Sequence, residues 1–194
     1  MPKFAFPKRH SSLGLSQLPL AFRQTCRRLA IRPTCFVLLV SVREQRMQLV
    51  QAMPDLTTPD GLVHKTFRIS TSRFGTGQTM NSNCTPLGLH RVAQKCGGGW
   101  PIGAVFKSRE MIGYTWAGRP GAPITNRILW LEGLEPGFNR GGPVDTFARY
   151  VYIHGTGDEP SLGRPASCGC IHVSSAELFP LYDSIPLGTL VWIH

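Results

Sequence analysis

The pattern of hydrophobic and polar positions predicts a chain built mainly from short strands. Residues 35–42 form an apolar run, residues 43–46 are polar and residues 47–50 are apolar again, which indicates a β-hairpin. Apolar and polar side chains alternate over residues 64–70, as in a strand with one buried face. We also expect short strands at 88–94, 104–107 and 127–131, a longer alternating strand at 147–154, and a closing strand at 190–193.

A single helix is expected near the end of the chain. Ser174 and Glu177 have the spacing of a capping box, in which the two residues satisfy the free amides of a first helical turn. Pro180 predicts that this helix is short or kinked. By contrast, residues 71–143 are rich in glycine and have no sustained helical period, and residues 54–61 form a loop. Long loops of this kind in a compact domain usually serve function.

Composition supports one folded domain. The 194 residues are 42% hydrophobic and 16% charged, which excludes a wholly disordered chain, and 21 glycines with 16 prolines favour a loop-rich β protein over a helical bundle. The longest apolar run, residues 35–40, is far shorter than the roughly 20 residues of a membrane span. None of the six cysteines forms a CxxC pair, so we expect no metal site, and we expect no cofactor.

The positive charge is concentrated at the beginning of the chain. Of 21 basic residues, seven lie within residues 1–34, which contain no acidic residue; the rest of the chain has 14 basic and 11 acidic residues. We interpret residues 1–34 as a flexible, solvated extension without the apolar periodicity needed to pack on the domain, and residues 35–194 as the domain. The balanced charge of the domain argues against a specific nucleic-acid partner.

The segment from His154 to His172 contains the candidate chemistry. His154 ends an expected strand, and Cys170 follows it by 16 residues, just before the expected helix. A cysteine and a histidine together can form a nucleophilic pair, in which an imidazolium and helix amides lower the thiol pKa from about 8.5. Gly169 allows an unusual turn, and the amides from Cys168 to Cys170 are candidates for an oxyanion hole.

Two other interpretations of these residues are open at this point. Isolated cysteines and histidines are more often buried structural groups than catalytic ones. Alternatively, Cys168, Cys170 and His172 would act together as metal ligands, although CxCxH is not a regular zinc spacing.

From about residue 35 to residue 194 the chain resembles the L,D-transpeptidase catalytic domain, also called the YkuD-like domain. The matching segments begin with the hairpin at 40–49 and with the strand and loop at 69–77, followed by Thr85-Pro-Leu-Gly88. His154-Gly155 matches as well, and Ser167-Cys-Gly-Cys-Ile171 is similar to the S/T-H-G-C signature of the family. The last match is the closing strand, Gly188-Thr-Leu-Val-Trp-Ile193. The chain departs from the family at Cys168, where the family has histidine, and at His172, where it usually has arginine or asparagine.

This resemblance implies a mainly β fold, a β-sandwich of mixed sheets with a short helix after the catalytic cysteine. It also implies that Cys170 is the nucleophile, that His154 is the general base and acid, and that the Gly155 backbone orients its ring. The backbone of Gly169 would contribute to the oxyanion hole. The residues expected to contact substrate are Ser167, Tyr152, Cys168 and His172.

The function implied by the resemblance is that of a cysteine-dependent L,D-transpeptidase. Such an enzyme joins peptidoglycan stem peptides through a thioester, in cell wall cross-linking or remodelling. The alternatives are an L,D-carboxypeptidase that uses water as acceptor, and a non-catalytic cell-wall binding module. We expect a monomer in the cell envelope or periplasm. However, residues 13–20 lack the apolar core of a signal peptide, so a cytoplasmic protein or a mis-assigned start are alternatives.

Overall fold

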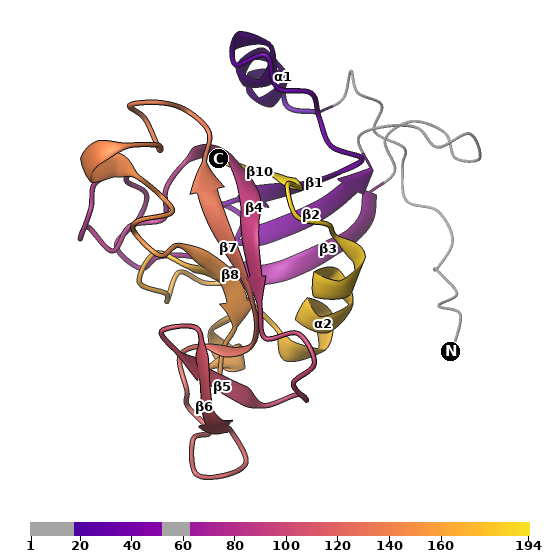
Figure 1. Ribbon diagram of the computed structural model, residues 1–194, viewed down its shortest axis with the longest axis vertical. Coiled ribbons are helices and arrows are strands. Elements are labelled where there is room, and N and C mark those ends of the chain that lie inside the picture. The colour runs from indigo at the N-terminus through magenta and orange to yellow at the C-terminus, as the bar shows by residue number, and fades with distance from the viewer. Residues whose placement is uncertain (1–17, 52–62) are drawn as a thin grey trace.

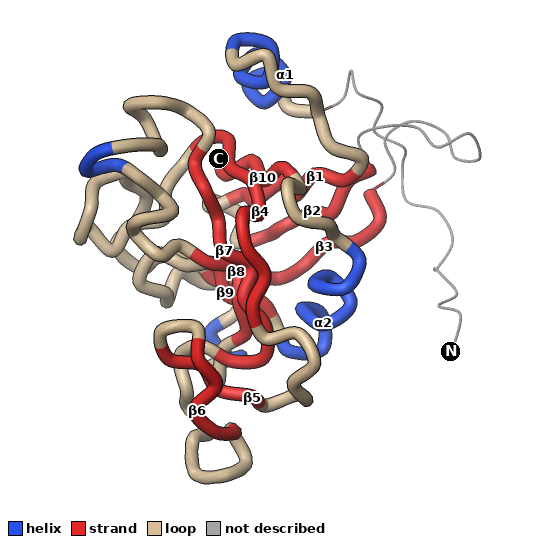
Figure 2. Tube along the Cα trace, in the orientation of Figure 1, coloured by secondary structure: helices blue, strands red, loops and turns tan. Residues whose placement is uncertain are grey.

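The computed structural model describes residues 18–51 and 63–194, and strands predominate in it (Figures 1 and 2). The strands are β1 (Phe36–Ser41), β2 (Arg46–Gln51), β3 (Val63–Ser70), β4 (Gly88–Cys96), β5 (Ala104–Lys107), β6 (Glu110–Tyr114), β7 (Thr125–Gly133), β8 (Tyr152–Gly155), β9 (Ile171–Val173) and β10 (Leu190–Ile193). The helices are α1 (Leu20–Arg28) and α2 (Ser175–Ser184), with 3₁₀ turns η2 (Gly142–Val144) and η3 (Glu159–Ser161). The expected loop at 54–61 lies outside the described residues.

The strands form one mixed sheet that closes on itself. Its order is β4-β10-β1-β2-β3-β9-β8-β7, and β7 pairs again with β4, while β5 and β6 form a hairpin beside β7. The pairs β1–β10 and β8–β9 are parallel and the other pairs are antiparallel. The two walls of this closed sheet enclose a core as in a sandwich, which confirms the predicted mainly β fold.

The core fills the interior of the closed sheet. Alternate residues of the strands point inward, among them Leu38, Phe67 and Ile153, which are almost completely buried. Helix α2 adds Leu178 and Leu181 to the same core. Burying several such side chains at about 1.5–3 kcal/mol each gives the sheet a rigid frame, on which the loops that follow the strands are positioned.

Helix α2 confirms the expected short helix after Cys170. It spans ten residues, begins at Ser175 and contains Pro180. The Ser174 hydroxyl donates to the Glu177 carboxylate at 3.0 Å and accepts no hydrogen bond from a helix amide, so the two residues of the capping box bind each other. None of the helices in the described residues is long and apolar enough to cross a membrane.

Residues 18–34 correct the prediction of an unpacked extension. Leu18, Phe22 and Cys26 recur every four residues on one face of α1 and its N-terminal flank, and all three are buried. They pack on the outer face of the sheet against residues of β1, β4 and β10, and the Phe22 ring meets the Trp192 ring edge-on at 6.1 Å. Arg23, Arg27 and Arg28 on the same helix obscured this stripe in the sequence. Residues 1–17 lie outside the described residues.

The long strand expected at 147–154 is also wrong in its first half. Strand β8 begins at Tyr152, and the residues before it form turns, with Tyr150 in a left-handed conformation at φ 56°. The cause is a set of contacts distant in sequence: the Trp130 ring stacks on the Phe147 ring at 4.0 Å, and its indole N–H donates to the Phe147 carbonyl. Strands β6 and β9 were not predicted.

Candidate active site

The thiol of Cys170 is held by the backbone of the neighbouring strand. Cys170 directly precedes β9, and Ile171 is the register partner of Ile153 in the parallel strand β8. This places Cys170 beside Tyr152, whose amide donates to the sulfur at 3.4 Å, while the thiol donates to the Tyr150 carbonyl at 3.6 Å. The position of the sulfur is therefore set by hydrogen bonds to the backbone of residues 150 and 152.

Cys170 opens into a pocket of about 190 Å³. Its walls come from three segments distant in sequence, namely residues 80–83, residues 148–151 and residues 168–170. A pocket of this size accepts a few atoms of a larger molecule that lies across the surface, and not a whole drug-sized ligand.

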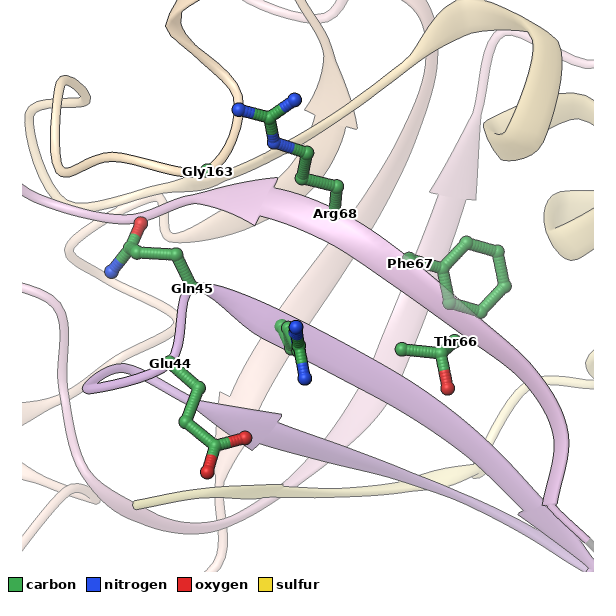
Figure 3. A pocket seen from close by; sticks show the side chains of 7 residues that line it. Glu44, Gln45, Thr66, Phe67, Arg68 and Gly163 are labelled. Carbon is green, nitrogen blue, oxygen red and sulfur yellow. The ribbon is translucent and has the colours of Figure 1, made fainter.

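A larger pocket of about 430 Å³ lies on β2 and β3 and is a different kind of site (Figure 3). Its lining residues are Glu44, Gln45, Arg46, Thr66, Phe67, Arg68 and Gly163. Figure 3 shows the Arg68 side chain extending over the chain at Gly163, where a β-carbon would collide with the guanidinium. This pocket contains no cysteine or histidine, whereas the smaller one contains the expected nucleophile, Cys170.

His154 is buried in β8 and has one ring nitrogen available for proton transfer. Its Nδ1 lies 2.8 Å from the Gly155 carbonyl oxygen. A carbonyl only accepts hydrogen bonds, so Nδ1 carries the proton and Nε2 is the basic nitrogen. The expected contact between the Gly155 backbone and the ring is therefore present.

The structure places Cys170 close to the strand that carries His154 but does not join the two side chains directly. Tyr152 and His154 share one face of β8, and His172 is the register partner of His154 in β9. Cys170 lies just before β9, with its sulfur at the Tyr152 amide. The His154 ring lies 4.8 Å from the His172 ring and 6.3 Å from the Tyr152 ring. No hydrogen bond links His154 to Cys170 in the part of the chain that the structure describes.

The electrostatics of this group correct the expected thiolate–imidazolium pair. Burial, and secondarily the neighbouring His172, lowers the pKa of His154 to about 3, and burial lowers the pKa of His172 to about 4. Burial raises the pKa of the Cys170 thiol to about 11. Near neutral pH the site therefore holds a neutral thiol and neutral imidazoles. The expected helix amides do not reach the thiol, because β9 lies between Cys170 and α2.

The segment from Ser167 to Cys170 is shaped by its own hydrogen bonds. The Ser167 hydroxyl donates to the Cys170 carbonyl at 2.6 Å and accepts from the Gly169 amide at 3.2 Å. Gly169 has φ 115°, which favours glycine, and the Thr85 hydroxyl donates to its carbonyl at 3.1 Å. In this arrangement the Gly169 amide is engaged, so any role in an oxyanion hole requires the Ser167 hydroxyl to release it.

The residues expected to contact substrate occupy different positions. Cys168 is exposed and lines the pocket. Ser167 and Tyr152 are buried, and neither they nor His172 line the pocket. The buried Nδ1 of His172 has no hydrogen-bond partner among the described residues. The same part of the chain contains no group of three or more histidine, cysteine, aspartate or glutamate side chains placed to hold a metal ion.

Arg149 is a site residue that sequence reasoning missed. Its guanidinium donates to the carbonyls of Gly77, Gln78 and Cys84 and to the Ser82 hydroxyl, at 2.7–3.3 Å. These bonds fix the loop that forms one wall of the pocket. The partners lie 65–72 residues away in sequence, so no local motif could have identified them.

Comparison with known proteins gives one family. The model of the YkuD family, described as the L,D-transpeptidase catalytic domain, matches residues 36–193. A Bacillus subtilis (strain 168) protein named "Putative L,D-transpeptidase YqjB" is 38% identical over 76 residues, which cover 39% of this chain and 38% of that protein.

Solved structures share the fold at low sequence identity. An L,D-transpeptidase from Mycobacterium smegmatis matches with a TM-score of 0.50 and 18% identity, over 82% of this chain and 58% of that one. Bd1075 of Bdellovibrio bacteriovorus matches with a TM-score of 0.52 and 13% identity, over 83% of this chain and 48% of that one. This chain thus spans between 38% and 58% of the length of these three relatives.

Proposed function

The chain belongs to the YkuD family of L,D-transpeptidase catalytic domains, and from this premise we propose that it is a cysteine-dependent L,D-transpeptidase acting on peptidoglycan stem peptides. The observation that carries the proposal is the placement of Cys170. Its thiol opens into a pocket and accepts a hydrogen bond from the amide of Tyr152, which shares a face of β8 with His154. The Nδ1 of His154 is bound to the Gly155 carbonyl, so its Nε2 is the basic nitrogen. The cell envelope is the corresponding place of action.

The neutral state of both groups defines the first step. His154 Nε2 accepts the thiol proton as the sulfur attacks the acyl carbon, so that no free thiolate accumulates beforehand. This requires the ring and the sulfur to come within hydrogen-bond reach when a substrate is bound. The new bond is C–S, and the negative charge moves to the carbonyl oxygen. The Cys170 amide would stabilise it there, together with the Gly169 amide once the Ser167 hydroxyl releases it.

Collapse of this intermediate breaks the C–N bond to the terminal residue. His154 returns its proton to the leaving amine, and a thioester remains on Cys170. The amine of a second stem then attacks the thioester, and the sulfur leaves and recovers a proton through the same histidine. Splitting one acyl transfer into two lowers the barrier of each.

Mass spectrometry of muropeptides after incubation with tetrapeptide stems tests the proposal. Cross-linked dimers support a transpeptidase, whereas trimmed tripeptides alone would support the carboxypeptidase. Cys170→Ala is the matched control and should give neither product. If the wild-type protein forms neither product, and forms no adduct on Cys170 with an acylating carbapenem, the result would support the non-catalytic cell-wall binding module instead.

A further inference from the structure

Arg109 occupies a strained position at the tip of the β5–β6 hairpin. Lys107 pairs with Glu110, so the turn contains only Ser108 and Arg109. Both have positive φ, 52° and 70°, as in the two-residue turns where asparagine and glycine are preferred. Backbone strain of this kind persists only where surrounding contacts hold it, and it is concentrated at functional sites.

The contacts of the Arg109 side chain lead to the Cys170 pocket. The guanidinium lies 4.7 Å from the Trp130 ring centre and 5.2 Å from that of Tyr150, and it donates to the Tyr152 hydroxyl at 3.2 Å. Tyr150 lines the pocket, and the Tyr152 amide donates to the Cys170 sulfur. Arg109 therefore contacts two residues, Tyr150 and Tyr152, whose backbones hydrogen-bond to the thiol.

Arg109 has no carboxylate partner in the described ranges 18–51 and 63–194. The ion pairs found there join Arg28 to Glu135, Lys65 to Glu177, and Arg91 and Arg140 to Glu132. An arginine has five N–H donors, and within these ranges Arg109 uses one of them, toward Tyr152. Arg149, the cation nearer the pocket, instead directs its donors at the loop around Ser82.

We propose that Arg109 binds a carboxylate of the acyl donor, so that Cys170 acts preferentially on anionic peptides. A guanidinium stacked on aromatic rings is held in orientation, and its planar fork matches the two oxygens of a carboxylate. The carboxylate is either at the C-terminus of the leaving residue or on a side chain beside the scissile bond. The identity of the ligand as an acyl donor rests on the proposed function.

Alkylation of Cys170 tests the charge preference without any turnover. Iodoacetate and iodoacetamide form the same C–S bond and release the same iodide, but only iodoacetate carries a carboxylate. The ratio of the two rates at Cys170, measured by peptide mass spectrometry, cancels any change in the thiol pKa. We expect Arg109→Asn to lower the iodoacetate-to-iodoacetamide ratio by about threefold to tenfold, the range for losing a partly exposed charge-assisted contact.

Two variants control this measurement. Asparagine tolerates the left-handed conformation, so Arg109→Asn keeps the turn. Arg109→Lys keeps the charge but not the planar fork, so its ratio should fall between those of the wild type and Arg109→Asn. Lys107→Gln removes a positive charge from the same hairpin, and its ratio should match the wild type. An unchanged ratio in Arg109→Asn, or an equal fall in Lys107→Gln, would overturn the proposal.

Steady-state kinetics with amidated stem peptides identify the carboxylate. With a free donor, Arg109→Asn should raise KM by about tenfold and change kcat less, since the lost contact is to bound substrate. Amidating the carboxylate that Arg109 binds should raise the wild-type KM and abolish the difference between wild type and variant. If neither amidation does so, Arg109 does not bind the donor. The two proposals can fail separately. If Arg109→Asn changes the alkylation ratio but the wild-type protein has no transpeptidase activity, the preference of Arg109 for anions stands and the proposed function is refuted.

Discussion

The rings of His154 and His172 lie side by side, 4.8 Å apart, because the two residues are register partners across the parallel strands β8 and β9. Only His154 has its Nδ1 bound to a backbone carbonyl, that of Gly155. The Nδ1 of His172 is buried without a hydrogen-bond partner in the described part of the chain. The better-oriented ring is therefore His154, although both rings are neutral near neutral pH.

This difference predicts how the two histidines respond to substitution. His154→Ala should leave the fold intact and slow the acylation of Cys170 by about 10²- to 10⁴-fold, the usual contribution of a general acid–base group. His172→Asn introduces a residue common at this place in the family and should slow acylation by less than about tenfold. Stopped-flow measurement of adduct formation with a carbapenem checks both, and the reverse order of effects would identify His172 as the base.

Buried neutral histidines also predict acid sensitivity. The pKa values of His90 and His172 are lowered to about 4, and that of His154 to about 3, mainly by burial, whereas an unfolded histidine has a pKa of about 6.5. Below pH 6.5 the unfolded chain thus binds more protons than the folded one, so stability falls as the pH decreases toward 4. Each such histidine contributes a slope of about 1.4 kcal/mol per pH unit in this range.

Urea unfolding between pH 7.5 and 5 measures this slope. His172→Asn lacks one of the three groups, so it should take up about one proton fewer on unfolding near pH 5. The stability of both proteins should be nearly constant above pH 7. Equal slopes for wild type and variant would show that His172 is protonated in the folded protein.

The sequence was sufficient for most strands because their apolar positions pack locally in a period of two. Strand β1, with Leu38 and Val40 in the core, and strand β10 were predicted from such runs. The turn before β8 was not, because its conformation depends on Trp130, which precedes Phe147 by 17 residues. A period-two pattern cannot distinguish a strand from a turn whose side chains pack on a distant ring.

His154 and Cys170 were predicted as a pair from the sequence, but the electrostatics around them were not. The structure places the Cys170 sulfur at the Tyr152 amide, two residues before His154 on β8. Their neutral state follows from burial, which depends on the whole fold. Arg109 and Arg149 were not predicted, because a single arginine in a loop or turn forms no recognisable sequence motif and the partners of both lie far away in sequence.

Helix α1 leads to a prediction about stability. Phe22 is fully buried against the sheet, while Leu20 on the same helix is 59% exposed. Phe22→Ala should therefore lower the free energy of unfolding by about 3 kcal/mol, the lower end of the range for phenylalanine, and Leu20→Ala should change it by less than about 0.5 kcal/mol.

Removal of residues 1–33 extends this test, because it uncovers Val37 and Trp192 on the outer face of the sheet. We expect the truncated protein to lose cooperative unfolding or to aggregate, as measured by circular dichroism and light scattering. A truncated protein with wild-type stability would show that the packing of α1 contributes nothing to the stability of the domain.

The exposed Cys168, two residues before Cys170, predicts a role in recovery from oxidation. Peroxide converts a thiolate to a sulfenic acid, which releases water when a second thiol condenses with it to a disulfide. A bridge between Cys168 and Cys170 would close a very small ring and be easily reduced.

In reducing buffer, Cys168→Ser should keep most of the acylation rate. After mild peroxide and then dithiothreitol, it should recover less than the wild type, since its sulfenic acid proceeds to irreversible states. Cys35→Ser removes another exposed thiol and should recover like the wild type; equal recovery in all three proteins would leave Cys168 a packing role only.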